Sequence, residues 1–179
     1  MRSTGKASAA TGGSSNERER RHFRAPGELG LSLPPASVPR GSYVPAVRTG
    51  NYIQVAGQGP RWDGELKFAG KVGRDLTIKE GQRAAELCAL NILSHLSRML
   101  DGDLSRVVRI VRVAGVIQAE SSFTEHAKVL NGASDLFFAA LGEPGQHARI
   151  ATGASSLPSN MAVEIEATVE IKDVSSKLA

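Results

Sequence analysis

The segment that most constrains the fold is a run of β-branched residues at positions 106–117, between two helical patterns. A strand with one wet face alternates apolar and polar side chains, but this one is apolar on both predicted faces. Two helices can cover only one side of a small sheet, so the other side needs a separate cover. We expect a second copy of the chain to supply it. The predicted faces are Val107, Val111, Val113 and Ile117 on one side, and Val108, Ile110 and Val116 on the other.

Both helical patterns begin with the spacing of a capping box, a Thr or Ser followed three residues later by Glu. The first is Thr-Ile-Lys-Glu at 77–80, and apolar residues then recur every three or four positions until 101–102. The second is Ser-Phe-Thr-Glu at 122–125, and glycine and proline end that helix at 142–144. Its predicted core stripe is Ala127, Leu130, Ala133, Phe137 and Ala140.

The remaining patterns predict strands. Residues 43–48 and 52–56 flank Gly50-Asn51, which is typical of a β-hairpin turn. The loop at 59–75 contains one short predicted strand at 66–68. Residues 162–172 alternate cleanly between apolar and polar side chains. The order predicts an α+β domain, a mixed sheet with two helices packed on one face.

The two ends of the chain differ from this body. Residues 1–26 are rich in Ser, Gly, Ala, Thr and Arg, with only Phe23 as a large apolar side chain, which predicts disorder. Residues 29–39 are punctuated by proline and predict an extended arm over the domain. We therefore expect a basic tail and arm at 1–37, a folded domain at 38–173 and a flexible C-terminus at 174–179.

The N-terminal tail lacks the apolar core of a secretion signal, and no run of about 18 apolar residues exists in the chain. We therefore predict a cytoplasmic protein that does not span a membrane. Arginine with Ser and Ala would also suit an organellar transit peptide, although Glu17 and Glu19 argue against one. An organelle is thus the alternative location.

The charge pattern argues against nucleic acid as a partner. Residues 1–40 hold seven basic and three acidic side chains, whereas residues 41–179 hold 15 of each. The net charge of +4 therefore belongs to the tail, and a neutral body is poorly suited to track a phosphate backbone. Cys88, the one cysteine, cannot form an internal disulfide, and no Cys/His cluster has the spacing of a zinc site.

Arg149 stands out among the residues that could do chemistry. It lies in a predicted strand, with the small residues Ala151 and Gly153 on its own face, so its guanidinium has open space. The arginine fork suits a planar carboxylate ligand. The alternative is a structural ion pair with Glu164 or Glu166 of the last strand, and spacing alone does not decide between the two.

Several motifs follow one another in the order and spacing of a known family. Tyr43-Val44 is followed by Gly57-Gln-Gly-Pro60, Asn91-Ile92 and Asn131-x-x-Ser-Asp-x-Phe-Phe138. Arg149 then precedes Leu157-Pro158 by eight residues, and Val163-Glu-Ile-Glu-Ala167 follows. Over residues 38–172 the sequence resembles the RidA/YjgF family, also called L-PSP endoribonucleases or reactive-intermediate deaminases. The Arg-x7-Leu-Pro-x5-Glu-Ile-Glu-Ala segment is the most specific part of this resemblance.

The resemblance implies a chorismate-mutase-like domain that forms homotrimers through its sheets, with a pocket at each subunit interface. It implies hydrolysis of enamines and imines of short 2-amino acids to 2-keto acids and ammonia, without a cofactor or a metal. The small 2-imino or 2-keto acid would then be the ligand.

The resemblance also assigns roles by position. It implies that Arg149 binds the substrate carboxylate and that Glu164 orients or activates the attacking water. It places Tyr43 over the substrate, and Gly57 and Asn131 in or near the pocket.

Two positions depart from the family pattern. Ala151 replaces a frequent cysteine, which removes a thiol but leaves a backbone carbonyl for water. His147 replaces a proline and is expected on the strand face of Arg149, where it could reshape the pocket or its proton supply. The departures suggest a divergent subgroup and leave open a non-catalytic module that binds small carboxylates. Some relatives have been described as ribonucleases or translation inhibitors, so the resemblance leaves an endoribonuclease or translation inhibitor as a further alternative.

Overall fold

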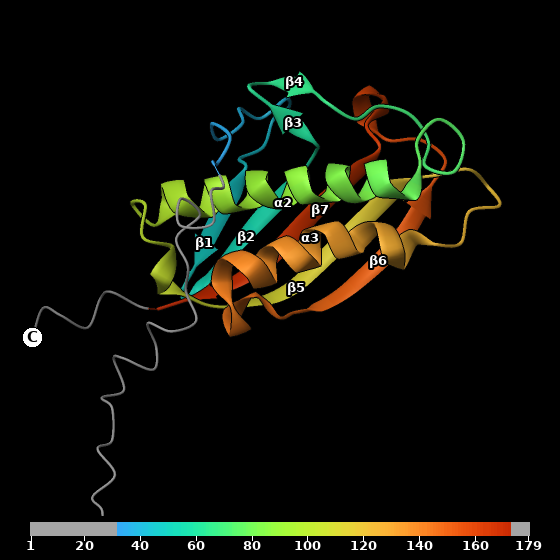
Figure 1. Cartoon of the computed structure of the whole chain (residues 1–179). Helices are drawn as coiled ribbons and strands as arrows, with labels where there is room; N and C mark the ends of the chain where they lie inside the picture. Colours follow the sequence, from blue (N-terminus) through green and yellow to red (C-terminus); the bar gives the residue numbers. More distant parts are fainter. Residues whose placement is uncertain (1–31, 173–179) are drawn as a thin grey trace, which may run out of the picture.

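The computed structural model describes residues 32–172. The predicted disordered tail at 1–26 and the predicted flexible C-terminus at 174–179 lie outside these residues. The elements follow the predicted order of two strands, a helix, a strand, a helix and two strands, with a short hairpin in the loop where the sequence predicts a single short strand. They form one five-stranded sheet with both helices on the same face (Figure 1). The predicted α+β class with a mixed sheet is confirmed.

The sheet has the strand order β1-β2-β7-β5-β6. Its strands are β1 (Ala46–Thr49), β2 (Tyr52–Gln58), β5 (Val107–Gln118), β6 (Ala148–Ala154) and β7 (Val163–Ile171). β5 and β6 pair in parallel and the other neighbours are antiparallel. Helix α3 makes the crossover between the two parallel strands, which cannot be joined by a tight turn. β6 is therefore an edge strand that runs beside α3 (Figure 1).

Helix α2 (Ile78–Met99) begins where the sequence predicts. The Thr77 side chain accepts a hydrogen bond from the Glu80 backbone, and the Glu80 carboxylate accepts one from the Thr77 backbone. The predicted capping box is thus confirmed. The helix buries a long stripe of alanine, leucine and isoleucine against the sheet, and each buried large side chain contributes about 1.5–3 kcal/mol.

Helix α3 (His126–Leu141) begins one turn later than predicted, and the second predicted capping box is wrong. Its N-cap is Glu125, without a side-chain hydrogen bond. The Phe123 backbone N–H instead bonds to the Glu120 carbonyl, so residues 120–123 form a turn that precludes a helix there. Ala127 is consequently exposed, and the helix buries Val129, Leu130, Ala133, Leu136, Phe137, Ala140 and Leu141.

The hairpin β1–β2 and the alternation of β7 are confirmed. Gly50, with φ of +56°, makes the turn between β1 and β2. The loop that follows differs from expectation, since it forms a two-stranded hairpin, β3 (Arg61–Trp62) and β4 (Glu65–Leu66), rather than a single strand at 66–68. Asp63 and Gly64, both at positive φ, make its tight turn.

Strand β5 corrects the prediction for its two faces. Its register against β7 shifts twice, between Val107 and Arg109 and between Ile110 and Arg112. Each β-bulge adds one residue to β5. The buried positions up to 117 are therefore 107, 110, 113, 115 and 117, which do not follow a strict alternation. Ile110 therefore faces the helices, and Val111 faces away from them, the reverse of the assignment by strict alternation.

The sheet face opposite the helices is called the open face here. It carries large apolar side chains that are 37–50% exposed within one chain, unlike the fully buried residues of the helix face. They come from four of the five strands and are Val47, Tyr52, Val108, Val111 and Ile150.

The described part of the arm, residues 32–39, lies extended against α2 and the end of β2. The Pro34 carbonyl accepts a hydrogen bond from Ser94, a buried serine of α2. The Ser37 hydroxyl donates to Gln58 and lies 3.1 Å from Nε2 of His95. The arm thereby forms one side of the cavity described next.

Candidate functional site

A cavity of about 870 Å³ lies between the arm, the β3–β4 hairpin and the ends of β2 and β7. Tyr43, Gly57 and Glu164, three of the predicted site residues, line it together. Glu164 projects from the open face of β7, and Gly57 lies beside it on β2, where the register between β2 and β7 shifts. A Cβ atom on residue 57 would lie 2.4 Å from Oε1 of Glu164, so glycine here makes room for the carboxylate.

The Glu164 carboxyl is half-buried, and its environment favours the protonated form. Burial, followed by the nearby charge of Glu166, raises the pKa of Glu164 above its ordinary value of 4.5. Glu166 is exposed and pairs with Arg112 at 3.1 Å across the sheet. Of these two neighbouring glutamates, Glu164 is therefore the half-buried one, and it lines the cavity with a raised pKa.

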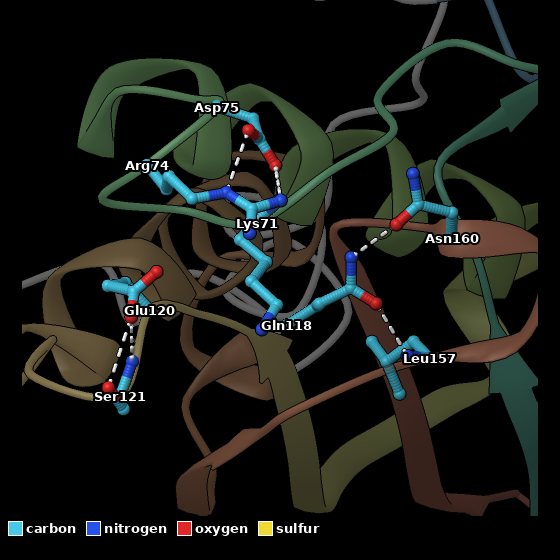
Figure 2. A network of polar contacts seen from close by, with 8 residues as sticks. All are labelled: Lys71, Arg74, Asp75, Gln118, Glu120, Ser121, Leu157 and Asn160. Carbon is cyan, nitrogen blue, oxygen red and sulfur yellow. Dashed lines mark hydrogen bonds and ion pairs between the residues drawn. The ribbon is translucent and has the colours of Figure 1, made fainter.

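Gln118, at the end of β5, fixes one wall of the cavity. Its side-chain amide donates to Asn160 and accepts from the backbone of Leu157, both at 2.6 Å (Figure 2). These bonds hold the short helix η4 (Pro158–Asn160), whose Pro158 and Ser159 line the cavity. Ser159 and Asn160 have φ of 55° and 58°, unfavourable values that persist because their surroundings hold them.

Arg149 lies elsewhere, on the helix face of β6 against α3. Its Nη1 donates to Ser134 Oγ at 2.8 Å, and its Nη2 donates to Asn131 Oδ1 at 2.8 Å and to the Ala127 carbonyl at 3.2 Å. All three acceptors are neutral, and no carboxylate of residues 32–172 forms an ion pair with this guanidinium. The predicted alternative, an ion pair with Glu164 or Glu166, is absent within the described chain.

His147 lies just before β6 and shares Ser134 with Arg149. Its Nδ1 is 2.6 Å from the Gly145 carbonyl, and its Nε2 is 3.0 Å from Ser134 Oγ. A carbonyl only accepts, so Nδ1 carries the proton and Nε2 accepts from the Ser134 hydroxyl. Burial is the main reason that the pKa of His147 is lowered, which keeps the ring neutral. The neutral ring thus orients the hydroxyl that receives Arg149.

One chain does not bring all the predicted site residues together. Arg149 pairs with Val113 on the helix face of the sheet. Glu164 pairs with Val116 on the open face, two strands away from β6. Asn131 and His147 lie with Arg149, and Ala151 follows it on the same face, half-buried against the core. The chain thus carries two separate groups, one around Arg149 and one around Glu164.

Sequence reasoning assigned no role to Ser134, Gln118, Arg40 or Arg61. The position of Ser134, three residues after Asn131 on one helix face, was a usable signal. Gln118 also had a usable sequence signal, because it is a polar residue at the end of an apolar strand. The two arginines gave no signal, because only the folded arm and hairpin bring them to one cavity.

Residues 32–172 contain no group of three or more His, Cys, Asp or Glu side chains placed to hold a metal ion. Cys88 is fully buried, with its thiol 3.6 Å from the Val163 carbonyl, and burial raises its pKa. A thiol in that state is a core side chain rather than a nucleophile. None of the helices in this part of the chain is long and apolar enough to cross a membrane.

The strand order, with both helices on one face, defines a chorismate-mutase-like α+β domain with a carboxylate in a cavity and an arginine held by neutral groups. The chain belongs to the YjgF family. The family model described as "YjgF/chorismate mutase-like, putative endoribonuclease" matches residues 25–170, which confirms the resemblance found in the sequence.

Individual relatives agree with this assignment. Protein TCP17 of Trypanosoma cruzi is 43% identical over 146 residues, which cover 81% of this chain and 91% of that protein. The crystal structure of Atu1372 from Agrobacterium tumefaciens, a protein of unknown function, is 46% identical with a TM-score of 0.76, covering 82% of this chain and 89% of that one. A putative endoribonuclease from Shewanella oneidensis is 32% identical with a TM-score of 0.79, covering 88% and 100%.

Proposed function

We propose that the protein is a hydrolytic deaminase of reactive enamines and imines derived from short 2-amino acids. The enamine first takes a proton on carbon to become the iminium form. Water then adds to the C=N carbon, the C–N bond breaks, and the products are a 2-keto acid and ammonia. The iminium carbon is already electrophilic, so the protein has to orient the substrate, position a water and move protons.

The observation that carries this proposal is the state of Arg149. Its positive charge faces only neutral acceptors in the described chain, and three hydrogen bonds leave two of its five N–H donors for a ligand. Asn131 and Ser134 hold the group still, so little side-chain entropy is lost on binding. A rigid, exposed arginine of this kind suits the carboxylate that all 2-imino acids share.

Glu164 suits the second role, activation of water. A carboxylate whose pKa is raised toward neutrality is a better general base than an ordinary glutamate, and such groups contribute about 10²–10⁴-fold to a rate. Tyr43 is about half exposed at the mouth of the same cavity, where its ring could pack over a bound substrate.

The two groups would act together only across a subunit interface. The open face carries five exposed large apolar side chains, more than a monomer usually leaves uncovered. We infer a homotrimer that buries this face and in which Arg149, on the edge strand β6 of one protomer, completes the Glu164 cavity of the next. Closed cyclic assemblies of this kind repeat one interface and therefore one site per protomer.

RNA cleavage is a second candidate, favoured by the family description and by the name of the Shewanella relative. The charge balance weighs against it, because 15 basic and 15 acidic side chains in residues 41–179 leave no excess to attract phosphates.

The test uses 2-aminoacrylate generated by a dehydratase, with semicarbazide to capture the imine. The protein should reduce capture, and Arg149→Ala should lower the rate constant for hydrolysis by about 10²–10³-fold, as expected for loss of a charged anchor. Arg83→Ala, at an exposed site on α2, is the control and should leave the rate unchanged. Full activity in Arg149→Ala would contradict the proposal.

Two other outcomes identify the alternatives. Unchanged capture together with calorimetric binding of a 2-keto acid would indicate a binding module. RNA degradation that Arg149→Ala or Glu164→Gln abolishes would indicate a nuclease.

A further inference from the structure

Two arginines meet in the cavity that holds Glu164. Arg40 comes from the end of the arm, and Arg61 opens strand β3. Both donate a hydrogen bond of 3.2 Å to the same acceptor, the carbonyl of Gly64. Two segments far apart in sequence therefore aim guanidinium groups at one point of the cavity wall.

This pairing of like charges has no counter-ion in the described chain. No carboxylate of residues 32–172 lies within 4.0 Å of either guanidinium, although Asp63 and Glu164 line the same cavity. Burial and then the nearby Arg40 charge lower the pKa of the Arg61 guanidinium, so the positive charge of Arg61 is disfavoured where it stands. An anion between the two groups would relieve that repulsion.

The arrangement is held in place rather than incidental. The Asn91 side chain, buried in α2, donates to the Arg61 carbonyl at 2.8 Å and so anchors the start of β3. The turn at Asp63 and Gly64, both at positive φ, directs the shared carbonyl toward the arginines. The arm is anchored next to them through Ser37 and Gln58.

We propose that Arg40 and Arg61 form a second anion site, which binds a carboxylate on the side chain of the substrate. This inference rests on the proposed function and narrows its substrate to 2-imino dicarboxylic acids. The α-carboxylate is bound by Arg149 of a neighbouring protomer, the imine carbon lies near Glu164, and the side-chain carboxylate reaches the two arginines. A cavity of about 870 Å³ is also far larger than a three-carbon imino acid needs.

The experiment compares two imines under semicarbazide capture, 2-iminoglutarate made from glutamate and 2-iminopropanoate made from alanine by amino-acid oxidases. The double variant Arg40→Gln with Arg61→Gln should lower kcat/KM for 2-iminoglutarate by about 10- to 100-fold. It should leave the value for 2-iminopropanoate within about twofold. A double variant that carries Arg61→Lys in place of Arg61→Gln should lose less of its kcat/KM for 2-iminoglutarate, because lysine keeps the charge of arginine but not its fork of donors.

Other results overturn the inference without touching the proposed function. An equal loss with both imines would mean that the arginines only hold the arm and hairpin. No loss with 2-iminoglutarate would mean that they do not bind the substrate.

If neither imine is hydrolysed, the proposed function fails and the second anion site is tested by binding. Calorimetry with 2-oxoglutarate and pyruvate then gives the answer. Tighter binding of 2-oxoglutarate that disappears in the double variant supports the site, and equal binding of the two acids overturns it.

Discussion

Arg149 and Glu164 lie on opposite faces of one sheet, with strand β5 between their strands. Adjacent strands are about 4.8 Å apart, so their backbones are separated by about 10 Å before the side chains diverge to the two faces. No rotamer change can bring both groups to one small substrate within a single chain. The proposed chemistry therefore depends on a second copy of the protein.

The pH dependence of the proposed reaction should show an acidic limb set by Glu164. Burial and Glu166 raise the pKa of this carboxyl, so it loses its function as a base already above pH 4.5. We expect kcat/KM to fall as pH decreases through that raised value. Glu166→Gln should move the limb to lower pH, because it removes the second cause of the shift. An unmoved limb would show that another group titrates.

Gly57→Ala should impair activity without unfolding the domain. The added Cβ would lie 2.4 Å from Oε1 of Glu164, and this carboxylate can swing away because it ends a flexible side chain. We expect kcat to fall by about 10- to 100-fold, less than the full effect of removing a general base.

The control for Gly57→Ala is a double-mutant cycle with Glu164→Gln. If glycine acts only by making room for Glu164, adding Gly57→Ala to Glu164→Gln should change nothing further. Additive losses would mean that Gly57 has a separate role.

The buried His95 and the half-buried His147 should make the fold sensitive to mild acid. Burial is the first cause of the lowered pKa of His95 and of His147, so both are neutral when folded and take up protons on unfolding. Their contribution to stability is present above about pH 6.5 and is lost as pH falls below it, at most about 1.4 kcal/mol per pH unit for each.

Chemical unfolding at pH 7 and pH 5 measures this effect. Replacing both histidines by Gln should flatten the decline relative to the wild type. Glu164 acts in the opposite direction, because its raised pKa stabilises the fold as pH falls, so the difference between variant and wild type is the quantity to compare. An identical decline in both would contradict the assignment.

The capping box of α2 should contribute measurably to stability. Thr77→Ala removes the acceptor for the Glu80 backbone N–H, and we expect a loss of about 0.5–2 kcal/mol in the free energy of unfolding by urea. Thr77→Ser keeps the hydroxyl and is the matched control. Equal stability of the Ala and Ser variants would show that the cap is dispensable.

Local patterns predicted most of the fold. The Thr77 capping box, the Gly50 turn and the alternation of β7 depend on residues close in sequence, and all three agree with the structure. The faces of β5 could not be predicted, because the two bulges arise from pairing with β7 and have no signature within β5 itself. A turn stabilised by backbone bonds likewise overrode the apparent capping box at Ser122.

The candidate site was less predictable than the fold. Sequence spacing left Arg149 between a ligand role and an ion pair, and only the packing of β6 on α3 shows that its partners are neutral. Sequence spacing also gave no reason to prefer Glu164 over Glu166. The two differ in their surroundings, because Glu164 lines the cavity and is the more buried, whereas Glu166 is exposed and pairs with Arg112. These properties come from tertiary neighbours and so lie outside any local pattern.

Complementation between two inactive variants shows whether each site is shared between two protomers. Arg149→Ala and Glu164→Gln would each be purified, then dissociated, mixed in equal amounts and reassembled. If each site takes Arg149 from one protomer and Glu164 from its neighbour, roughly a quarter of the sites in a random mixture regain both groups. We predict recovery of about that fraction of wild-type hydrolysis, and a mixture that assembles but stays inactive would contradict the account.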